Sequence, residues 1–270
     1  MTIIFDGTQG ITTPAETANN SVTTPVVKSG SALTLQTNGS TTAVTIDTSQ
    51  NVGIGVTNPS SYDPVTRNLV VGNLSGNTGI TISSGSSSGG YLTFADGTTG
   101  TDLYDGIITY SHASRAMTFY TAATDRMRID SSGRVTMPYQ PMASVTRNAS
   151  GTTTGGTYEM VYDSVQVNIG SHYNNTNGRF TCPVAGTYRV SAFGMGTLIA
   201  GNWNFFVSIR KNGSQQGGTA YNYGTPEDYK HASGNWLITC AAGDYISIWG
   251  GGNGGYYGEG YNGATFQLIG

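Results

Sequence analysis

Two short strings in this chain have the residue types and spacing of catalytic motifs. Gly85 to Gly89 reads Gly-Ser-Ser-Ser-Gly and fits the G-x-S-x-G pattern of nucleophilic serines, but no strand-to-helix turn is expected around it. Gly250 to Gly255 fits the phosphate-binding pattern G-x-G-x-x-G, and no helix is expected after it. Neither string has the structural context that its chemistry requires, so we expect no catalytic residues.

The titratable residues give no clear acid–base or metal site. Glu227 and Asp228 are adjacent, so in an extended strand they point to opposite faces and cannot flank one glycosidic bond. A carboxylate pair formed between chains stays open as an alternative. Three histidines lack zinc-ligand spacing: His112, His172 and His231. We predict a protein that is not an enzyme and has no cofactor, with Asp228 and Glu259 as weak calcium candidates because carboxylate oxygens are hard ligands.

The strongest binding signal is a set of aromatic residues beside Gly, Asn and acidic residues. They lie near residue 203, in 221–229 and in 250–261, three segments predicted to be loops. A ring that presents a flat apolar face beside hydrogen-bonding groups suits stacking against a sugar. The alternative is that some rings fill a core between subunits. The candidate binding residues are Trp203, Tyr221, Tyr223, Tyr229, Tyr256, Tyr257 and Tyr261.

Composition predicts an all-β chain. Only 10% of residues are charged and 40 are Gly, and no apolar pattern of helical period continues for three turns. The net charge of −3 provides no basic field for nucleic acid, and no apolar run is long enough to insert into a membrane.

Residues 1–10 lack the regions of a secretory signal, so we expect synthesis in a cytoplasm. Cys182 and Cys240 are therefore expected to be buried free thiols, with a disulfide as the alternative.

Residues 1–30 have little to bury. Their one apolar patch is Ile3, Ile4 and Phe5, and a polar stretch follows. Such a segment is ordered mainly by docking onto another surface. It is either a frayed terminus or an anchor peptide.

Residues 31–139 are predicted to be short strands separated by Gly, Asn, Ser and Asp. A loose repeat relates Ala32–Ile54 to Ala116–Met137, because each copy places Ile-Asp before a Ser-containing turn and a second short strand. Each strand has too few apolar positions to build a core within one chain. We expect three or more copies, wound about one axis, to form an elongated shaft.

Residues 140–270 are predicted to form a compact domain. All three Trp lie there, and its strands alternate clearly: Ile246 and Ile248 occupy one face, while Tyr245, Ser247 and Trp249 occupy the other. Asn212-Gly213 is a strong hairpin signal, and residues 242–244 form another turn signal. The pattern is typical of a β-sandwich or jelly roll.

A series of short motifs in this domain resembles the globular head of complement component one, subcomponent q. In chain order the motifs are Val165-x-Val167-Asn168, Tyr173, Gly178-x-Phe180-Thr181-Cys182-Pro183-Val184-x-Gly186-x-Tyr188, Lys211-Asn212-Gly213, Gly243-Asp244 and Thr265-Phe266-x-x-x-Ile269. The resemblance covers residues 158–270, with Val190 where the family commonly has Phe. It implies a trimeric jelly roll related to tumour necrosis factor. The residues that we expect to build its core and close the trimer are Phe180, Pro183, Tyr188 and Phe266.

The preceding section is similar to the shafts of tail fibres from tailed bacteriophages. The similarity lies in Asn51–Ser60, in YLTFADGTTGTD and in Gly106–Val135. It implies a homotrimeric virion fibre made in the host bacterial cytoplasm, with residues 1–30 bound to other tail, baseplate or neck proteins and the head directed outward. The expected function is binding of a host surface receptor, with a glycan favoured over a protein. Three alternatives are a structural fibre or decoration protein of the head, neck or baseplate, a polysaccharide-degrading tailspike, and a non-viral complement-like lectin.

Overall fold

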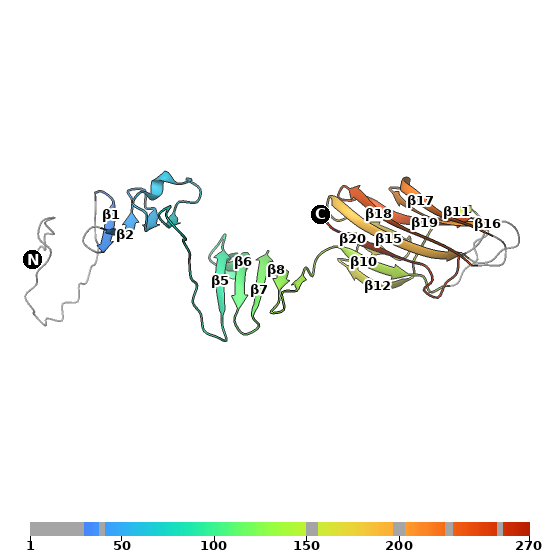
Figure 1. Ribbon diagram of the computed structural model, residues 1–270, viewed down its shortest axis with the longest axis horizontal. Helices are drawn as coiled ribbons and strands as arrows, with labels where there is room; N and C mark the ends of the chain where they lie inside the picture. Colours follow the sequence, from blue (N-terminus) through green and yellow to red (C-terminus); the bar gives the residue numbers. More distant parts are fainter. Residues whose placement is uncertain (1–29, 38–40, 150–155, 197–202, 225–228, 253–255) are drawn as a thin grey trace, which may run out of the picture. The chain divides into compact units, whose positions relative to one another are not determined.

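A computed structural model of the chain describes residues 30–37, 41–149, 156–196, 203–224, 229–252 and 256–270, with no side chains described for 203–204 and 217–224 (Figure 1). The described residues form twenty β-strands and two short 3₁₀ helices but no α-helix, which confirms the all-β prediction. No helix among these residues has the length and apolar character needed to span a membrane. The chain divides into two compact units, Met1–Ile82 and Ser83–Gly270.

The first unit contains a four-stranded sheet and one 3₁₀ turn. Its strands lie in sequence order, with only the last pair parallel: β1 (Leu33–Thr37), β2 (Thr41–Ile46), β3 (Val52–Ile54) and β4 (Leu69–Val71). The 3₁₀ turn η1 (Pro59–Ser61) lies between β3 and β4.

The second unit begins with an antiparallel sheet of five consecutive strands, which we call the meander. Its elements are β5 (Gly89–Phe94), η2 (Gly100–Tyr104), β6 (Gly106–Ser111), β7 (Ala116–Thr121), β8 (Thr124–Ile129) and β9 (Val135–Thr136). The register places two rows of apolar residues on one face: Leu92, Ile108, Phe119 and Met127, and beside them Tyr110, Met117, Ile129 and Val135.

This apolar face of the meander is not covered by the described residues. Leu92, Phe94 and Val135 are 52%, 57% and 52% exposed. The opposite face is more polar, because a row from Tyr91 through Thr109, Thr118 and Arg128 crosses it. A stable domain needs at least two packed layers around its apolar surface, and the meander has one.

The predicted repeat is confirmed as one turn geometry used twice. The Asp47 carboxylate accepts the backbone N–H groups of Ser49 and Asn51, both at 2.9 Å. Asp130 accepts those of Ser132 (2.9 Å) and Arg134 (3.0 Å) in the same way. In each turn, an aspartate that follows a strand satisfies backbone donors that would otherwise lack a partner.

Residues from Met142 onward form two facing sheets, as Figure 1 shows for the labelled strands. Sheet 1 contains, in spatial order, β12 (Ser164–Ile169), β10 (Met142–Thr146), β20 (Gly263–Leu268), β15 (Gly186–Gly196) and β18 (Lys230–Cys240). Sheet 2 contains β13 (Tyr173–Asn174), β14 (Arg179–Thr181), β19 (Tyr245–Gly252), β16 (Trp203–Lys211) and β17 (Ser214–Gly224), and β11 (Gly156–Glu159) also pairs with β19. Two antiparallel sheets with long crossovers make this domain a jelly roll.

The core of the domain is the space between these two sheets. Every second residue of β15 and β16 points into it, and the predicted alternation holds because Tyr188, Val190, Phe205 and Ile209 are fully buried. The Phe180 and Phe266 rings stack with centroids 5.2 Å apart and planes 2° apart. This stack joins sheet 2 to sheet 1, since Phe180 belongs to β14 and Phe266 to β20.

Both predicted turns are present, and they contact each other. Asn212 and Gly213 have φ of 50° and 81°, the left-handed conformation that an Asn-Gly hairpin turn requires. The Asn212 side chain donates to the Asp244 carboxylate (2.7 Å) and accepts the backbone N–H of Tyr245 (2.9 Å). The hairpin that joins β16 and β17 is therefore held against the turn before β19.

Cys182 and Cys240 are buried free thiols in this structure. Burial raises the pKa of both thiols, and Cys182 also hydrogen-bonds with Cys240. A buried thiol with a raised pKa is a poor nucleophile.

Candidate functional site

Three of the predicted binding residues come together at one end of the jelly roll. The ring of Tyr257 makes edge contacts with Tyr229 and Tyr261, at centroid distances of 5.6 Å and 5.3 Å. We call these three residues the tyrosine cluster. Tyr229 and Tyr261 are 47% and 51% exposed, so the cluster presents ring surface to solvent.

The backbone of the cluster is held by a buried asparagine. Asn262 is fully buried, and its side-chain oxygen accepts the backbone N–H of Met195 at 3.2 Å. Its amide nitrogen donates to the carbonyls of Met195 and Tyr257. Gly194 permits this arrangement, because a Cβ at that position would lie 2.6 Å from the Asn262 side-chain oxygen.

The other side of the loop is attached to the segment after β10. The backbone N–H groups of Glu259 and Gly260 donate to the carbonyls of Asn148 (3.1 Å) and Arg147 (2.8 Å). Glu259 has a φ of 55°, so the loop turns sharply at this residue. The negative charge of Glu259 is the main cause of a raised pKa at Tyr257.

A shallow hollow of about 260 Å³ lies beside the cluster. Phe193 and Tyr261 contribute apolar surface to it, and His231 and Ser233 contribute polar groups. Aromatic faces beside hydrogen-bonding groups are the chemistry that binds a sugar ring.

Tyr256 does not belong to this exposed surface, in contrast to the prediction. It is only 7% exposed, because its ring packs 5.3 Å from Tyr158 and the Arg147 guanidinium lies 4.0 Å from the ring centroid. Its backbone also pairs with Gly196. Tyr256 therefore supports the loop from inside, while its neighbour Tyr257 faces outward.

The remaining binding candidates lie in strands instead of the predicted loops. Trp203 is the first residue of β16, and Tyr221 and Tyr223 belong to β17, where they pair with Phe206 and Asn204. The side chains of Trp203, Tyr221 and Tyr223 lie outside the described part of the structure.

The predicted calcium and anchor residues are only partly described. Asp228 lies outside the described residues, as do Ile3, Ile4 and Phe5. Among the described residues, no group of three or more His, Cys, Asp or Glu side chains is arranged to hold a metal ion. Glu259 lies in the loop of the tyrosine cluster and belongs to no such group among the described residues.

Three of the four residues expected to close a trimer are buried inside one chain and do not reach its surface. Phe180, Tyr188 and Phe266 are fully buried within one chain, because they belong to the inward faces of β14, β15 and β20. They build the core, as predicted, but present no surface to another copy. Pro183 is partly exposed in the turn after β14.

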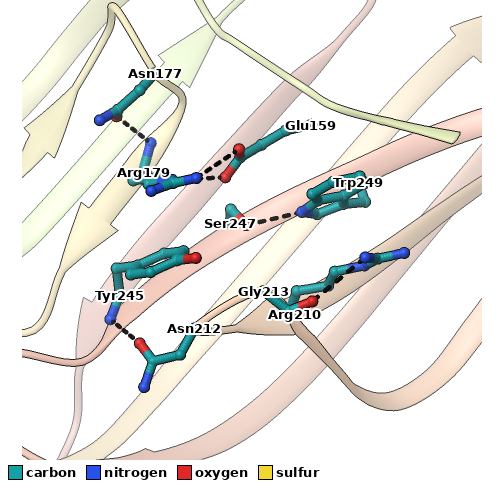
Figure 2. Close-up of polar contacts among 9 residues, drawn as sticks. All are labelled: Glu159, Asn177, Arg179, Arg210, Asn212, Gly213, Tyr245, Ser247 and Trp249. Atoms are coloured by element: carbon teal, nitrogen blue, oxygen red, sulfur yellow. Dashed lines mark hydrogen bonds and ion pairs between the residues drawn. The ribbon is translucent and has the colours of Figure 1, made fainter.

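A second group of polar and aromatic side chains, which the sequence motifs did not indicate, lies on the outer face of sheet 2 (Figure 2). The Arg179 guanidinium lies 4.3 Å from the Tyr245 ring centroid, and that of Arg210 lies 3.9 Å from the Trp249 ring. Ser247 stands between the two rings along β19 and accepts the Trp249 indole N–H at 3.0 Å. The only sequence signal was the alternation of Tyr245, Ser247 and Trp249, because the arginines belong to other strands.

Comparison with known proteins defines the class of the C-terminal domain. The family model of the C1q domain matches residues 142–267. These residues are therefore similar to a C1q domain, and their two facing sheets form a jelly roll. The match begins at β10, earlier than residue 158, where the resemblance was expected to begin.

Three solved structures are similar to about half of the chain. The globular domain of zebrafish complement 1qA protein has 16% identity, a TM-score of 0.36, and coverage of 48% of this chain and 96% of its own. Eiger TNF from S. frugiperda has 9% identity and a TM-score of 0.37, with coverage of 48% of this chain and 93% of its own. Murine APRIL at pH 5.0 has 11% identity and a TM-score of 0.38, with coverage of 48% of this chain and 99% of its own. Among curated proteins, none matches the chain.

Proposed function

We propose that the chain is the subunit of a bacteriophage virion fibre, a non-enzymatic homotrimer whose C-terminal domain binds a glycan on the host cell surface. In this proposal residues 1–30 attach to other virion proteins, and residues 31–139 form the shaft. The assignment to a phage rests on the similarity of Asn51–Ser60 and Gly106–Val135 to tail-fibre shafts.

The observation that carries the binding role is the tyrosine cluster. Tyr229 and Tyr261 are exposed and Tyr257 is partly exposed, while the backbone of the cluster is held by Asn262 on one side and by the carbonyls of Arg147 and Asn148 on the other. A surface that is already ordered loses little conformational entropy when it binds a ligand. Rings beside a shallow hollow suit a weak, stacked sugar contact, and several heads on one particle would raise the effective affinity through avidity.

The apolar face of the meander supports assembly from several copies. A single layer with Leu92 and Phe94 more than half exposed gains stability when another copy covers it. The outer face of sheet 1 supports the same conclusion for the domain, because Leu237 and Ile269 are 69% and 50% exposed on it and line a hollow of about 350 Å³. Three copies related by one threefold axis could cover the apolar faces of both the shaft and the domain, without a change of symmetry between them.

The binding role is tested by competition for host cells. Purified full-length protein should reduce phage adsorption, and Tyr257→Ala and Tyr261→Ala should each weaken cell binding by about tenfold, as expected for loss of a stacked ring. Tyr139→Ala is the matched control, since Tyr139 is 57% exposed and lies outside the cluster. Equal binding by Tyr257→Ala and Tyr139→Ala would contradict the assignment.

The structural alternative is favoured by one observation: the uncovered apolar faces explain assembly without any receptor. A decoration protein of the head, neck or baseplate would show density on the particle but no competition for host cells. Release of reducing sugar ends from host polysaccharide would instead support a tailspike enzyme.

A further inference from the structure

Two arginines flank one serine on the outer face of sheet 2. The register pairs Ser247 of β19 with Arg179 of β14 on one side and with Arg210 of β16 on the other. Adjacent strands lie about 4.8 Å apart, so the two arginine backbones are roughly 10 Å apart across this row. Each guanidinium lies over an aromatic ring of β19, as Figure 2 shows for Tyr245 and Trp249.

The two arginines differ in their charge balance. Arg179 makes a two-point contact with the Glu159 carboxylate, with N–O distances of 3.0 Å and 3.1 Å. In the described part of the chain, no carboxylate lies within ion-pair distance of Arg210. Arg210 Nη1 donates to the Gly213 carbonyl at 3.3 Å, and the buried Nε has no hydrogen-bond partner among the described residues. Within the described residues, the positive charge of Arg210 is therefore not balanced by a carboxylate.

We propose that Arg210, held flat by Trp249, binds the carboxylate of an acidic sugar on this face. A guanidinium offers a planar pair of N–H groups that matches a carboxylate, and stacking on the indole fixes its orientation before the ligand arrives. The partly exposed rings of Trp249 and Tyr245 supply apolar surface for the sugar ring beside the charge. An acidic peptide fits less well, because flat aromatic rings lie beside the positive charge on this face and suit a sugar ring.

Glu159 determines how many carboxylates the face binds. Its contact with Arg179 neutralises the second positive charge in the row, so the site accepts one carboxylate at Arg210. Removal of the Glu159 charge would leave two unpaired guanidinium groups, one on either side of Ser247, for an acidic sugar polymer to contact. This site lies on sheet 2 and is independent of the tyrosine cluster and of the function proposed for it.

The test is a titration of the full-length protein with a galacturonate tetramer, and with the neutral maltotetraose as the ligand control. Calorimetry gives the affinity, and tryptophan fluorescence reports the summed environment of the three tryptophans, one of which is Trp249. Arg210→Gln should weaken binding of the acidic tetramer by at least about tenfold, the value of one charged hydrogen-bond contact. Arg210→Lys keeps the charge but loses the planar pair of donors, and should weaken binding by about threefold or more.

Two further variants separate a specific site from general charge. Arg115→Gln removes the same charge from an exposed turn of the meander and should leave affinity unchanged. Glu159→Gln should tighten binding by about threefold, because it releases Arg179. Unchanged affinity in Arg210→Gln, an equal loss in Arg115→Gln, or equal binding of the neutral tetramer would overturn the proposal. If Arg210→Gln did not fold, Arg210→Lys and Glu159→Gln would decide the matter.

Discussion

The side chain of Asn262 accepts a hydrogen bond from the backbone N–H of Met195 at 3.2 Å, and this contact joins the loop of the tyrosine cluster to the end of β15. Asn262 follows the exposed Tyr261 directly in the sequence and is itself fully buried. The position of the tyrosine cluster is therefore fixed by the buried side chain of Asn262.

Asn262→Ala should destabilise the domain and weaken binding by the tyrosine cluster together. The substitution leaves buried backbone groups of Met195 and Tyr257 without a partner, which costs about 1–3 kcal/mol. Thermal or denaturant unfolding measures the stability, and cell binding measures the function. Asn175→Ala is the matched control, because Asn175 is exposed. A variant as stable as the control would show that water replaces the side chain at no cost.

Phe180→Ala should destabilise the domain by about 3–5 kcal/mol, the usual effect of removing a buried ring. The ring stacks on Phe266 across the two sheets, so its loss leaves a cavity at the centre of the core. Denaturant unfolding of Phe180→Ala and of the milder Phe180→Leu measures the effect. A loss below about 1 kcal/mol for Phe180→Ala would mean that the core closes over the gap.

Leu92→Lys should reduce the association of chains, whereas Tyr91→Lys should not. The two residues are neighbours in β5 with similar exposure, 52% and 58%, but they lie on opposite faces of the meander. A lysine at 92 places a charge on the apolar face that we expect another copy to cover, and burying that charge is unfavourable. Light scattering gives the mass of each variant. Trimers of equal stability from both variants would locate the interface elsewhere.

The turn at Asp47 should weaken in acid. Hydrogen bonds from Ser60 and Asn51 lower the pKa of this carboxyl from 3.8 to about 2. Because the pKa is lower in the folded state, the unfolded chain takes up the proton first as pH falls. The stabilisation is thus complete above about pH 4 and is lost between about pH 4 and pH 2.

Amide protection of Ser49 and Asn51, corrected for intrinsic exchange, should fall in that pH window. Asp47→Asn should remove this pH dependence, while Asp105→Asn, which changes the same charge outside the turn, should retain it. Protection that stays constant from pH 4 to pH 2 in the unaltered protein would show that the carboxylate does not support the turn.

The facing of many strand residues was accessible from the sequence, because side chains alternate with a period of two whatever the neighbouring strand is. The start of β16 and the end of β17 were wrongly predicted as loops. The alternation around Ser247 correctly predicted that Ile246 and Ile248 share a face, and both are fully buried. Turn chemistry was equally local, since Asn212 and Gly213 adopt the left-handed conformation that their residue types favour. The Asp47 and Asp130 turns repeat because the same short sequence satisfies the same backbone donors.

The sequence by itself thus determined the all-β class, the inward and outward residues of the strands and the type of the tight turns, because these depend on contacts between near neighbours. The tertiary structure alone decided that Tyr256 is buried while Tyr257 stays partly exposed, since Arg147 and Tyr158 come from distant segments to cover the Tyr256 ring. It also decided that Ser247 lies between Arg179 and Arg210. Which strands become neighbours follows from the packing of two whole sheets, and no local pattern records it.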